Sequence, residues 1–195
     1  IVPVKGDLPS GEKGMVSIDE GIRFDASLES LSGLKTLSDD GVLTAGSSSQ
    51  ICDGAAAIMI VNDAGLEKLG LKPRAKIISL ALAGDDPVIM LTGPIPASKT
   101  VLEKADLSIE DMDLYEVNEA FAPVPLAWAH ELKADKEKLN VNGGAMALGH
   151  PLGGTGAKLM TTLLHELERR EGKYGLQAIC EGGGTANALI IERLN

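Results

Sequence analysis

Three short segments of the chain combine polar side chains with glycines and could carry chemistry. They are centred on Asn118, His150 and Cys180. An asparagine amide can orient a water or donate to a substrate oxygen, and a histidine exchanges protons near neutral pH. The run 182–184 after Cys180 offers glycine N–H groups as donors to an oxyanion. Each segment lies at the end of a predicted strand or the start of a predicted helix, where α/β folds place active sites, and this shared position favours a functional role.

Each of the three residues also has a purely structural interpretation. Asn118 can cap the helix that follows it, and His150 can be a hydrogen-bonded or surface residue of a loop. Cys180 can be a small buried apolar side chain beside a tight strand turn. The residue types alone leave both interpretations open.

The glycine-rich stretch 142–156 around His150 invites comparison with phosphate-binding loops. It lacks the Gly-Lys-Ser/Thr ending of a P-loop and the Gly-x-Gly-x-x-Gly of a dinucleotide fold, which disfavours nucleotide hydrolysis. Neither cysteine has a second cysteine or histidine at zinc-ligand spacing, and His130 and His165 lie alone on predicted helices. We therefore expect no metal site and two solvated histidines.

Strands and helices alternate along the chain after a polar, Gly- and Pro-rich start. The last two predicted strands have no helix between them and must be antiparallel neighbours. The sequence predicts an α/β fold with a mixed five-stranded sheet flanked by helices. The predicted strands are 55–61, 76–82, 113–117, 176–180 and 188–192; the predicted helices are 28–33, 63–69, 97–105, 120–132 and 152–170.

Residues 1–20 and 35–50 have no sustained hydrophobic period and are predicted to be loops. The small side chains of 44–49 would let a ligand approach the backbone closely, although an ordinary flexible loop explains them equally well.

The composition matches an ordinary globular protein, with 44% hydrophobic and 24% charged residues. A net charge of −10 argues against nucleic-acid binding, which needs clustered Lys and Arg. Two cysteines are too few for a disulfide framework, and no apolar run is long enough to span a membrane. Because Ile1 is not followed by a charged and then apolar leader, no signal peptide is expected, and we predict a soluble protein of the bacterial cytoplasm.

The three segments, Asn-Glu-Ala-Phe at 118–121, Gly-His-Pro-Leu-Gly at 149–153 and Cys-x-Gly-Gly-Gly at 180–184, resemble the C-terminal signature blocks of the thiolases, in the same order. Two further stretches, 44–57 and 93–97, also resemble that family. The resemblance covers essentially the whole chain and implies the C-terminal half of a thiolase, an acyltransferase of fatty acid metabolism and β-oxidation. It implies the end of a loop domain, facing coenzyme A (CoA), at 1–50 and the C-terminal domain at 51–195.

The resemblance implies specific catalytic roles. His150 would activate a nucleophilic cysteine carried by the N-terminal half of the family's chain, and Asn118 would hold a water that stabilises the thioester oxygen. Cys180 would be the acid/base for the α-carbon or the departing thiolate. Gly182 would donate its N–H to a second oxyanion hole. This chain alone would be inactive.

The family also implies contacts with its substrates, acetyl-CoA and acyl-CoA, and no tightly bound cofactor. Expected near the pantetheine or along its route are Ala45, Gly46, Ser49, Ala120 and Phe121; expected near the nucleotide end are Arg23, Ser30 and Leu34. The implied partners are the chain's own N-terminal half and further copies, in a homodimer or homotetramer.

Three features depart from the common thiolase pattern, and two alternative interpretations stay open. Gln50 stands where many members have Gly, Thr185-Ala186-Asn187 follows the glycine run, and Cys52 occupies a position that usually holds a small polar residue. Ketoacyl synthases share the fold but pair their cysteine with two histidines, or with His and Asn, so Cys180 among glycines favours a thiolase. A non-catalytic CoA-binding module, or one subunit of a split enzyme, is the other possible reading.

Overall fold

A computed structural model describes residues 2–194, which form two compact units that divide between Leu34 and Lys35. The first unit contains an antiparallel hairpin of β1 (Val4–Asp7) and β2 (Lys13–Val16), so the loop predicted for 1–20 is wrong over these residues. Its helix α1 (Leu28–Ser32) begins after Ser27, whose side chain forms a capping box with Ser30, and ends at Gly33. The helix predicted here is confirmed.

The second unit is built on a four-stranded mixed sheet in the order β3-β6-β5-β4. Strand β6 pairs antiparallel with both β3 and β5, whereas β4 runs parallel to β5. The antiparallel pairing of the last two strands is therefore confirmed. The strands are β3 (Ala75–Gly84), β4 (Leu114–Val117), β5 (Tyr174–Cys180) and β6 (Thr185–Arg193).

The predicted fifth strand, 55–61, is wrong. These residues form no strand, and their side chains are exposed. A continuous apolar run fits a buried strand only where a neighbouring strand accepts its backbone hydrogen bonds, and 55–61 has no such neighbour among the described residues. The α/β class and the mixed sheet flanked by helices are nevertheless confirmed.

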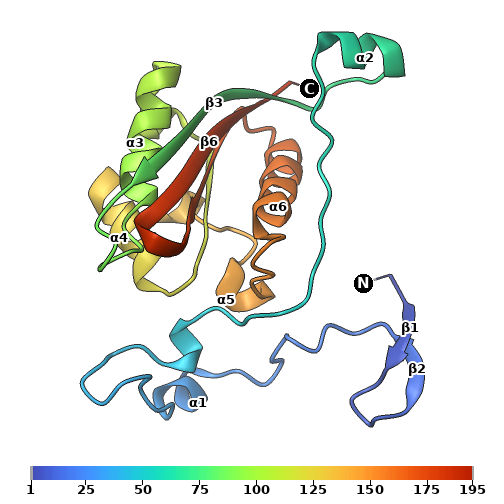
Figure 1. The fold of residues 1–195 in the computed structure, drawn as a ribbon, viewed down its shortest axis with the longest axis vertical. Coiled ribbons are helices and arrows are strands. Elements are labelled where there is room, and N and C mark those ends of the chain that lie inside the picture. The colour runs from blue at the N-terminus through green and yellow to red at the C-terminus, as the bar shows by residue number, and fades with distance from the viewer. Residues whose placement is uncertain (1, 195) are drawn as a thin grey trace. The chain divides into compact units, whose positions relative to one another are not determined.

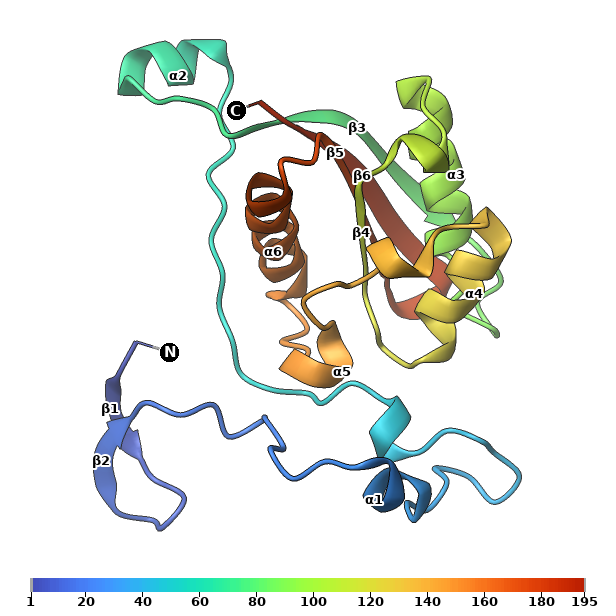
Figure 2. The ribbon, with the colours of Figure 1, turned by 180° about the vertical axis from the view of Figure 1, so that it is seen from behind.

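Helices cover both faces of the sheet (Figures 1 and 2). Helices α3 (Pro94–Ala105) and α4 (Pro123–Leu132) lie on one face, and α6 (Thr155–Arg170) lies on the other. Both α3 and α4 have proline in their first two positions, where the missing N–H has no intrahelical partner to lose. Helix α3 therefore begins at Pro94, three residues before the predicted start at 97. Helix α4 begins at Pro123, three residues after the predicted start at 120.

Short elements connect these layers. Helix α2 (Asp63–Leu69) has the predicted bounds, with Asn62 as its N-cap and Gly70 in the left-handed conformation after it. Helix α5 (Ala145–Leu148) interrupts the glycine-rich stretch. Residues 2–194 also contain four 3₁₀ turns, at Ala45–Ser47, Ile109–Asp111, Lys136–Lys138 and Gly182–Gly184.

The larger core lies between the sheet and the α3–α4 layer. Trp128 is fully buried there and meets the ring of Tyr115 edge to face, with 5.3 Å between ring centroids. Its indole N–H donates to Ser98 Oγ at 2.8 Å, so the one polar group of the tryptophan side chain has a hydrogen-bond partner inside the core. A smaller core joins α6 to the other face through Leu163 and Leu167.

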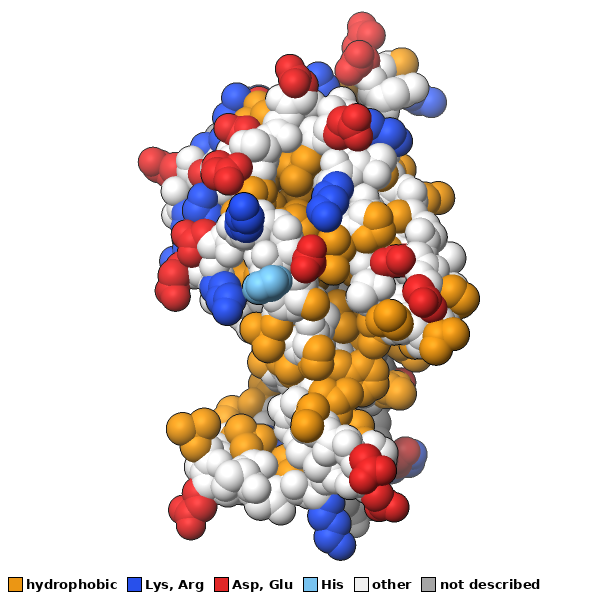
Figure 3. Space-filling model, turned by 90° about the vertical axis from the view of Figure 1, so that its left-hand side faces the viewer, with side chains coloured by type: hydrophobic (Ala, Val, Ile, Leu, Met, Phe, Trp, Pro, Cys, Tyr) orange, Lys and Arg blue, Asp and Glu red, His pale blue; other side chains and the backbone are white. Residues whose placement is uncertain are grey.

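Two surface features bear on the excluded functions. On the face shown in Figure 3, acidic and basic side chains are interspersed over the surface. Among residues 2–194, no helix is both long and apolar enough to cross a bilayer. His130 and His165 are exposed, as predicted.

Because the indole N–H of Trp128 is buried, Ser98→Ala should destabilise the fold by about 1–3 kcal/mol, the usual cost of an unsatisfied buried donor. Urea denaturation would measure the loss. The control is Lys99→Ala, an exposed neighbour on the same helix, with an expected change within about 0.5 kcal/mol. Equal losses in the two variants would contradict the role given to this hydrogen bond.

Candidate active site

Asn118 follows the last residue of β4 and remains tied to the sheet, because its backbone N–H donates to Ala178 O at 2.9 Å. The side chain is 1% exposed, and its Nδ2 lies 3.5 Å from His150 Nε2. Its Oδ1 is buried without a hydrogen-bond partner among the described residues. A rigidly held amide with a free acceptor can position a polar group of a substrate.

The backbone around His150 is fixed by a hydrogen bond and by the tight packing of Gly149. Its N–H donates to Gln50 O at 2.7 Å, and Gly149 before it has φ +83°. A Cβ on Gly149 would also lie 2.4 Å from Cys52 Sγ, so only glycine fits there. Burial, together with the positive charge of Lys158, lowers the pKa of His150 below its usual value. The ring is therefore neutral at pH 7 and able to accept a proton.

Cys180 ends β5 and is buried. Burial raises the pKa of its thiol, while hydrogen bonds from its own backbone and from the Asn118 side chain oppose that rise. At neutral pH the group is a thiol that carries its proton. Asn118 thus bridges a neutral base, His150, and a protonated acid, Cys180, from two neighbouring strand ends.

The loop 44–50 lies against the start of α4. Ser49 donates to Ala120 O from both its N–H, at 3.1 Å, and its Oγ, at 3.2 Å, and Ala122 N–H donates to Ser47 O at 2.9 Å. Of the predicted CoA contacts, Ala45, Gly46, Ser49, Ala120 and Phe121 are therefore brought together. The remaining three, Arg23, Ser30 and Leu34, lie in the first unit and stay predictions, and the Ser30 hydroxyl is engaged in the cap of α1.

Comparison with known proteins gives this geometry its context. The family model "Thiolase, C-terminal domain" matches residues 71–193, and "Thiolase, N-terminal domain" matches residues 1–64. The chain belongs to the thiolase family. The domain division at residue 50 stays a prediction.

The thiolase relatives are similar in both sequence and structure. The steroid 3-ketoacyl-CoA thiolase FadA6 of Mycobacterium tuberculosis is 56% identical over 94% of this chain and 45% of its own length. The acetyl-CoA acetyltransferase structure of Bacillus anthracis has a TM-score of 0.91 at 45% identity, over 100% of this chain and 49% of that one. Human mitochondrial 3-ketoacyl-CoA thiolase in complex with CoA has a TM-score of 0.86 at 43% identity, over 98% and 48%. The chain thus spans about half the length of the relatives it matches.

Within this thiolase chain, Glu119 holds the loop that leads to His150. Its Oε1 accepts from Asn140 Nδ2 at 2.9 Å and its Oε2 from Met146 N–H at 3.0 Å. A Cβ on Gly144 would lie 2.3 Å from the Glu119 carboxyl carbon, so glycine is required for this approach. The sequence analysis missed this role, although an acidic residue directly after Asn118 at a buried strand end was a signal.

The glycine run after Cys180 is shaped by local constraints. Gly183 and Gly184 have φ of +74° and +81°, and a Cβ on Gly184 would meet Asp85 O at 2.6 Å. The Glu181 carboxylate accepts from Asn187 Nδ2 at 2.5 Å and from Thr185 Oγ1 at 3.3 Å. These contacts hold the turn that carries Gly182, whose oxyanion role stays a prediction.

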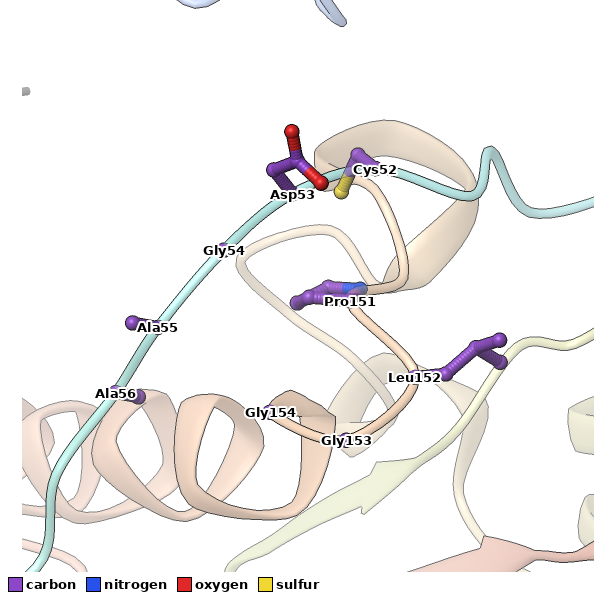
Figure 4. A pocket seen from close by; sticks show the side chains of 9 residues that line it. All are labelled: Cys52, Asp53, Gly54, Ala55, Ala56, Pro151, Leu152, Gly153 and Gly154. Atoms are coloured by element: carbon purple, nitrogen blue, oxygen red, sulfur yellow. The ribbon is translucent and has the colours of Figure 1, made fainter.

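A shallow depression of about 410 Å³ lies between the segment 52–56 and the loop 151–154 (Figure 4). Its lining includes none of the four predicted catalytic residues. Within the described part of the chain, no three His, Cys, Asp or Glu side chains are grouped closely enough to hold a metal ion.

Glu116 generates a prediction about stability and pH. The side chain is 1% exposed, and its Oε2 has no hydrogen-bond partner among the described residues. Burial, with the charges of Glu119 and Glu166, raises its pKa from 4.5 to about 8, against the opposing effect of Lys158. The folded protein therefore keeps a proton that the unfolded chain releases between those two pH values.

Stability should accordingly fall as pH rises from about 4.5 to about 8, by about 1.4 kcal/mol per unit of pKa shift. Glu116→Gln cannot ionise, so its melting temperature should exceed that of the unsubstituted chain by a margin that grows across this window. Glu110→Gln, at an exposed carboxylate, is the control and should show no growing margin. A constant difference between Glu116→Gln and the unsubstituted chain from pH 5 to pH 8 would refute the assignment.

Proposed function

We propose that the intact protein is an acyl-CoA:acetyl-CoA C-acyltransferase that catalyses reversible Claisen condensation and thiolysis of 3-ketoacyl-CoA. The observation that carries this proposal is the buried contact of the Asn118 amide with a neutral His150 and a protonated Cys180. Such a pairing of proton acceptor and proton donor suits a reaction in which a carbanion forms and a thiolate departs. The names of the relatives, 3-ketoacyl-CoA thiolase and acetyl-CoA acetyltransferase, support the same chemistry.

In the proposed first half-reaction, His150 takes the proton of a nucleophilic cysteine, whose thiolate attacks the acyl-CoA carbonyl. The carbonyl becomes an oxyanion, then CoA leaves as a thiolate and an acyl-enzyme remains. The nucleophile would come from the N-terminal half of the enzyme. Cys52 is half-buried against Gly149, and Cys180 serves the second step.

In the proposed second half-reaction, the Cys180 thiolate, formed when its thiol protonates the departing CoA, removes a proton from the α-carbon of acetyl-CoA. The resulting carbanion attacks the acyl-enzyme carbonyl, so a carbon–carbon bond forms as the carbon–sulfur bond to the nucleophile breaks. Asn118, acting through a water with His150, would stabilise the enolate oxygen, and Gly182 N–H the tetrahedral oxyanion. Thiolysis is the same sequence reversed.

CoA thioesters are the proposed ligands, as substrates and not as a tightly bound cofactor. The contacts of the loop 44–50 with residues 120–122 and with His150 support a pantetheine route along this loop. A structure of the similar human mitochondrial enzyme in complex with CoA also supports it. Arg23, Ser30 and Leu34 would meet the nucleotide end.

The proposed partner of this chain is the N-terminal half of the enzyme. An apolar strip on β3 is open to solvent, with Ile77, Leu80 and Leu82 exposed by 47%, 57% and 77%. The apolar side chains of 55–61 are exposed as well. Burial of such surfaces stabilises association. Assembly of the intact enzyme as a homodimer or homotetramer, and its location in the cytoplasm, stay predictions.

This chain alone should show no thiolysis of acetoacetyl-CoA, because the proposed nucleophile belongs to the N-terminal half of the enzyme and the proposed role of Cys180 is that of acid/base. Turnover is measured by loss of the substrate's enolate absorbance. The positive control is the same chain joined to the N-terminal half. Appreciable turnover by the 195-residue chain would refute the proposal that the nucleophile lies elsewhere.

Cys180→Ser should separate the two half-reactions in the complete enzyme. Serine preserves the packing but replaces a thiol with a hydroxyl that is far too weakly acidic to exchange protons. Acyl transfer from acetyl-CoA to the nucleophile, detected by mass spectrometry of the intact protein, should persist. Condensation should fall by at least about 10²-fold, because its α-carbon deprotonation depends on Cys180.

The matched control is Cys52→Ser, the same substitution at the other cysteine, with little expected change in either half-reaction. A purely structural Cys180 gives small and equal losses in both steps. That outcome would remove Cys180 from the mechanism.

A further inference from the structure

Thr155, the first residue of α6, makes the contact with His150 that the proposed roles do not use. The residue is 1% exposed. Its Oγ1 lies 2.6 Å from His150 Nδ1 and 2.9 Å from Pro151 O. Both ring nitrogens of His150 therefore have a polar neighbour, Thr155 Oγ1 at Nδ1 and Asn118 Nδ2 at Nε2.

The position of the protons follows from what each atom can do. Pro151 O can only accept, so the hydrogen in its contact with Thr155 comes from the hydroxyl. A hydroxyl has a single hydrogen, so at its contact with His150 the same Oγ1 must accept. Nδ1 then carries the proton of the neutral ring. Nε2 keeps its lone pair, which faces the donor Nδ2 of Asn118.

The reverse arrangement is less favourable. If the Thr155 hydroxyl donated to Nδ1, the proton would sit on Nε2 and face the Asn118 amide nitrogen, placing two donors together. Turning that amide over would offer its oxygen to Nε2. It would, however, exchange a buried unpaired carbonyl oxygen for a buried unpaired N–H, which proteins tolerate less well.

We propose that Thr155 is a positioning residue that fixes the neutral tautomer of His150, with the proton on Nδ1 and the lone pair on Nε2, the ring nitrogen that can accept a proton. Its catalytic consequence rests on the proposed function. Nε2 takes the proton of the nucleophile, and Nδ1–H continues to donate to the same oxygen in the charged ring. The hydroxyl therefore does not reorient during proton transfer, which keeps the site preorganised.

The direct test is nuclear magnetic resonance of the protein labelled with ¹⁵N in its histidine rings, of which there are three. His150→Gln assigns the signals. Above the titration range, His150 should show a protonated Nδ1 and an unprotonated Nε2. A neutral His150 with its proton on Nε2 in the unsubstituted protein would overturn the proposal, whatever the behaviour of any variant.

Two substitutions at Thr155 separate the hydroxyl from the rest of the side chain. Thr155→Val keeps the shape but removes the acceptor, and should populate the Nε2–H tautomer and lower kcat in the complete enzyme by about 10²-fold with little change in KM. Thr155→Ser should restore both. Thr162→Val is the control, since Thr162 makes the same hydroxyl bond, to Lys158 O at 3.1 Å, without a histidine, and it should change neither.

The two readouts distinguish the inference from the function on which it rests. An Nδ1–H tautomer that depends on the residue 155 hydroxyl, in a protein without thiolase activity, would refute the proposed function and leave the positioning role standing. An unchanged tautomer in Thr155→Val would refute the role of Thr155, even in an active thiolase.

Discussion

Val117 of β4 pairs with Ala178 of β5 in a parallel register, and the rest of the site depends on this alignment. Parallel strands end at the same edge of a sheet, so the residues that follow β4 and the last residue of β5 arrive together. The bond from Asn118 N–H to Ala178 O extends the ladder by one step and fixes where the amide side chain begins. Cys180 then lies within reach of that amide. A shift of one residue would turn either side chain to the opposite face.

His150 reaches the same edge from a loop, and its position requires several independent anchors. Glu119 binds the loop near its start, Gln50 O accepts the histidine N–H, and Lys158 donates to Leu148 O at 3.0 Å and to Gly149 O at 2.7 Å. These anchors come from the residues that follow β4, from the 44–50 loop and from α6. Loops are mobile unless their polar backbone groups are satisfied, so anchoring on three sides gives a loop residue the precision of a sheet residue.

Much of this could be predicted from the sequence, and the failures at 55–61, Glu119 and Thr155 share one cause. Strand β3 and helix α2 follow from local pattern, because periodicity and caps are local signals. The predicted strand 55–61 fails because its composition describes a buried strand without providing a partner. Glu119 lies inside the Asn-Glu-Ala-Phe motif and Thr155 inside the glycine-rich stretch 142–156, but a carboxylate and a hydroxyl have the same sequence signal whether they face solvent or fix a neighbour. Only the folded contacts distinguish these cases.

Burial acts on both proton-transferring groups: it lowers the pKa of His150 and raises the pKa of Cys180. Removing water disfavours a charged imidazole and a charged thiolate alike, so His150 loses its proton and Cys180 keeps its own. The same site then contains an acceptor and a donor at one pH without any ion pair between them. An ion pair would hold both groups in their charged forms and so exchange the roles of acceptor and donor. Neutral His150 and neutral Cys180 both need a hydrogen-bond donor between them. The Asn118 amide can fill this place because its Nδ2 carries two hydrogens, one for each neighbour. An aspartate at this position would instead favour the imidazolium and further disfavour the thiolate, which explains why an uncharged side chain suits the end of β4.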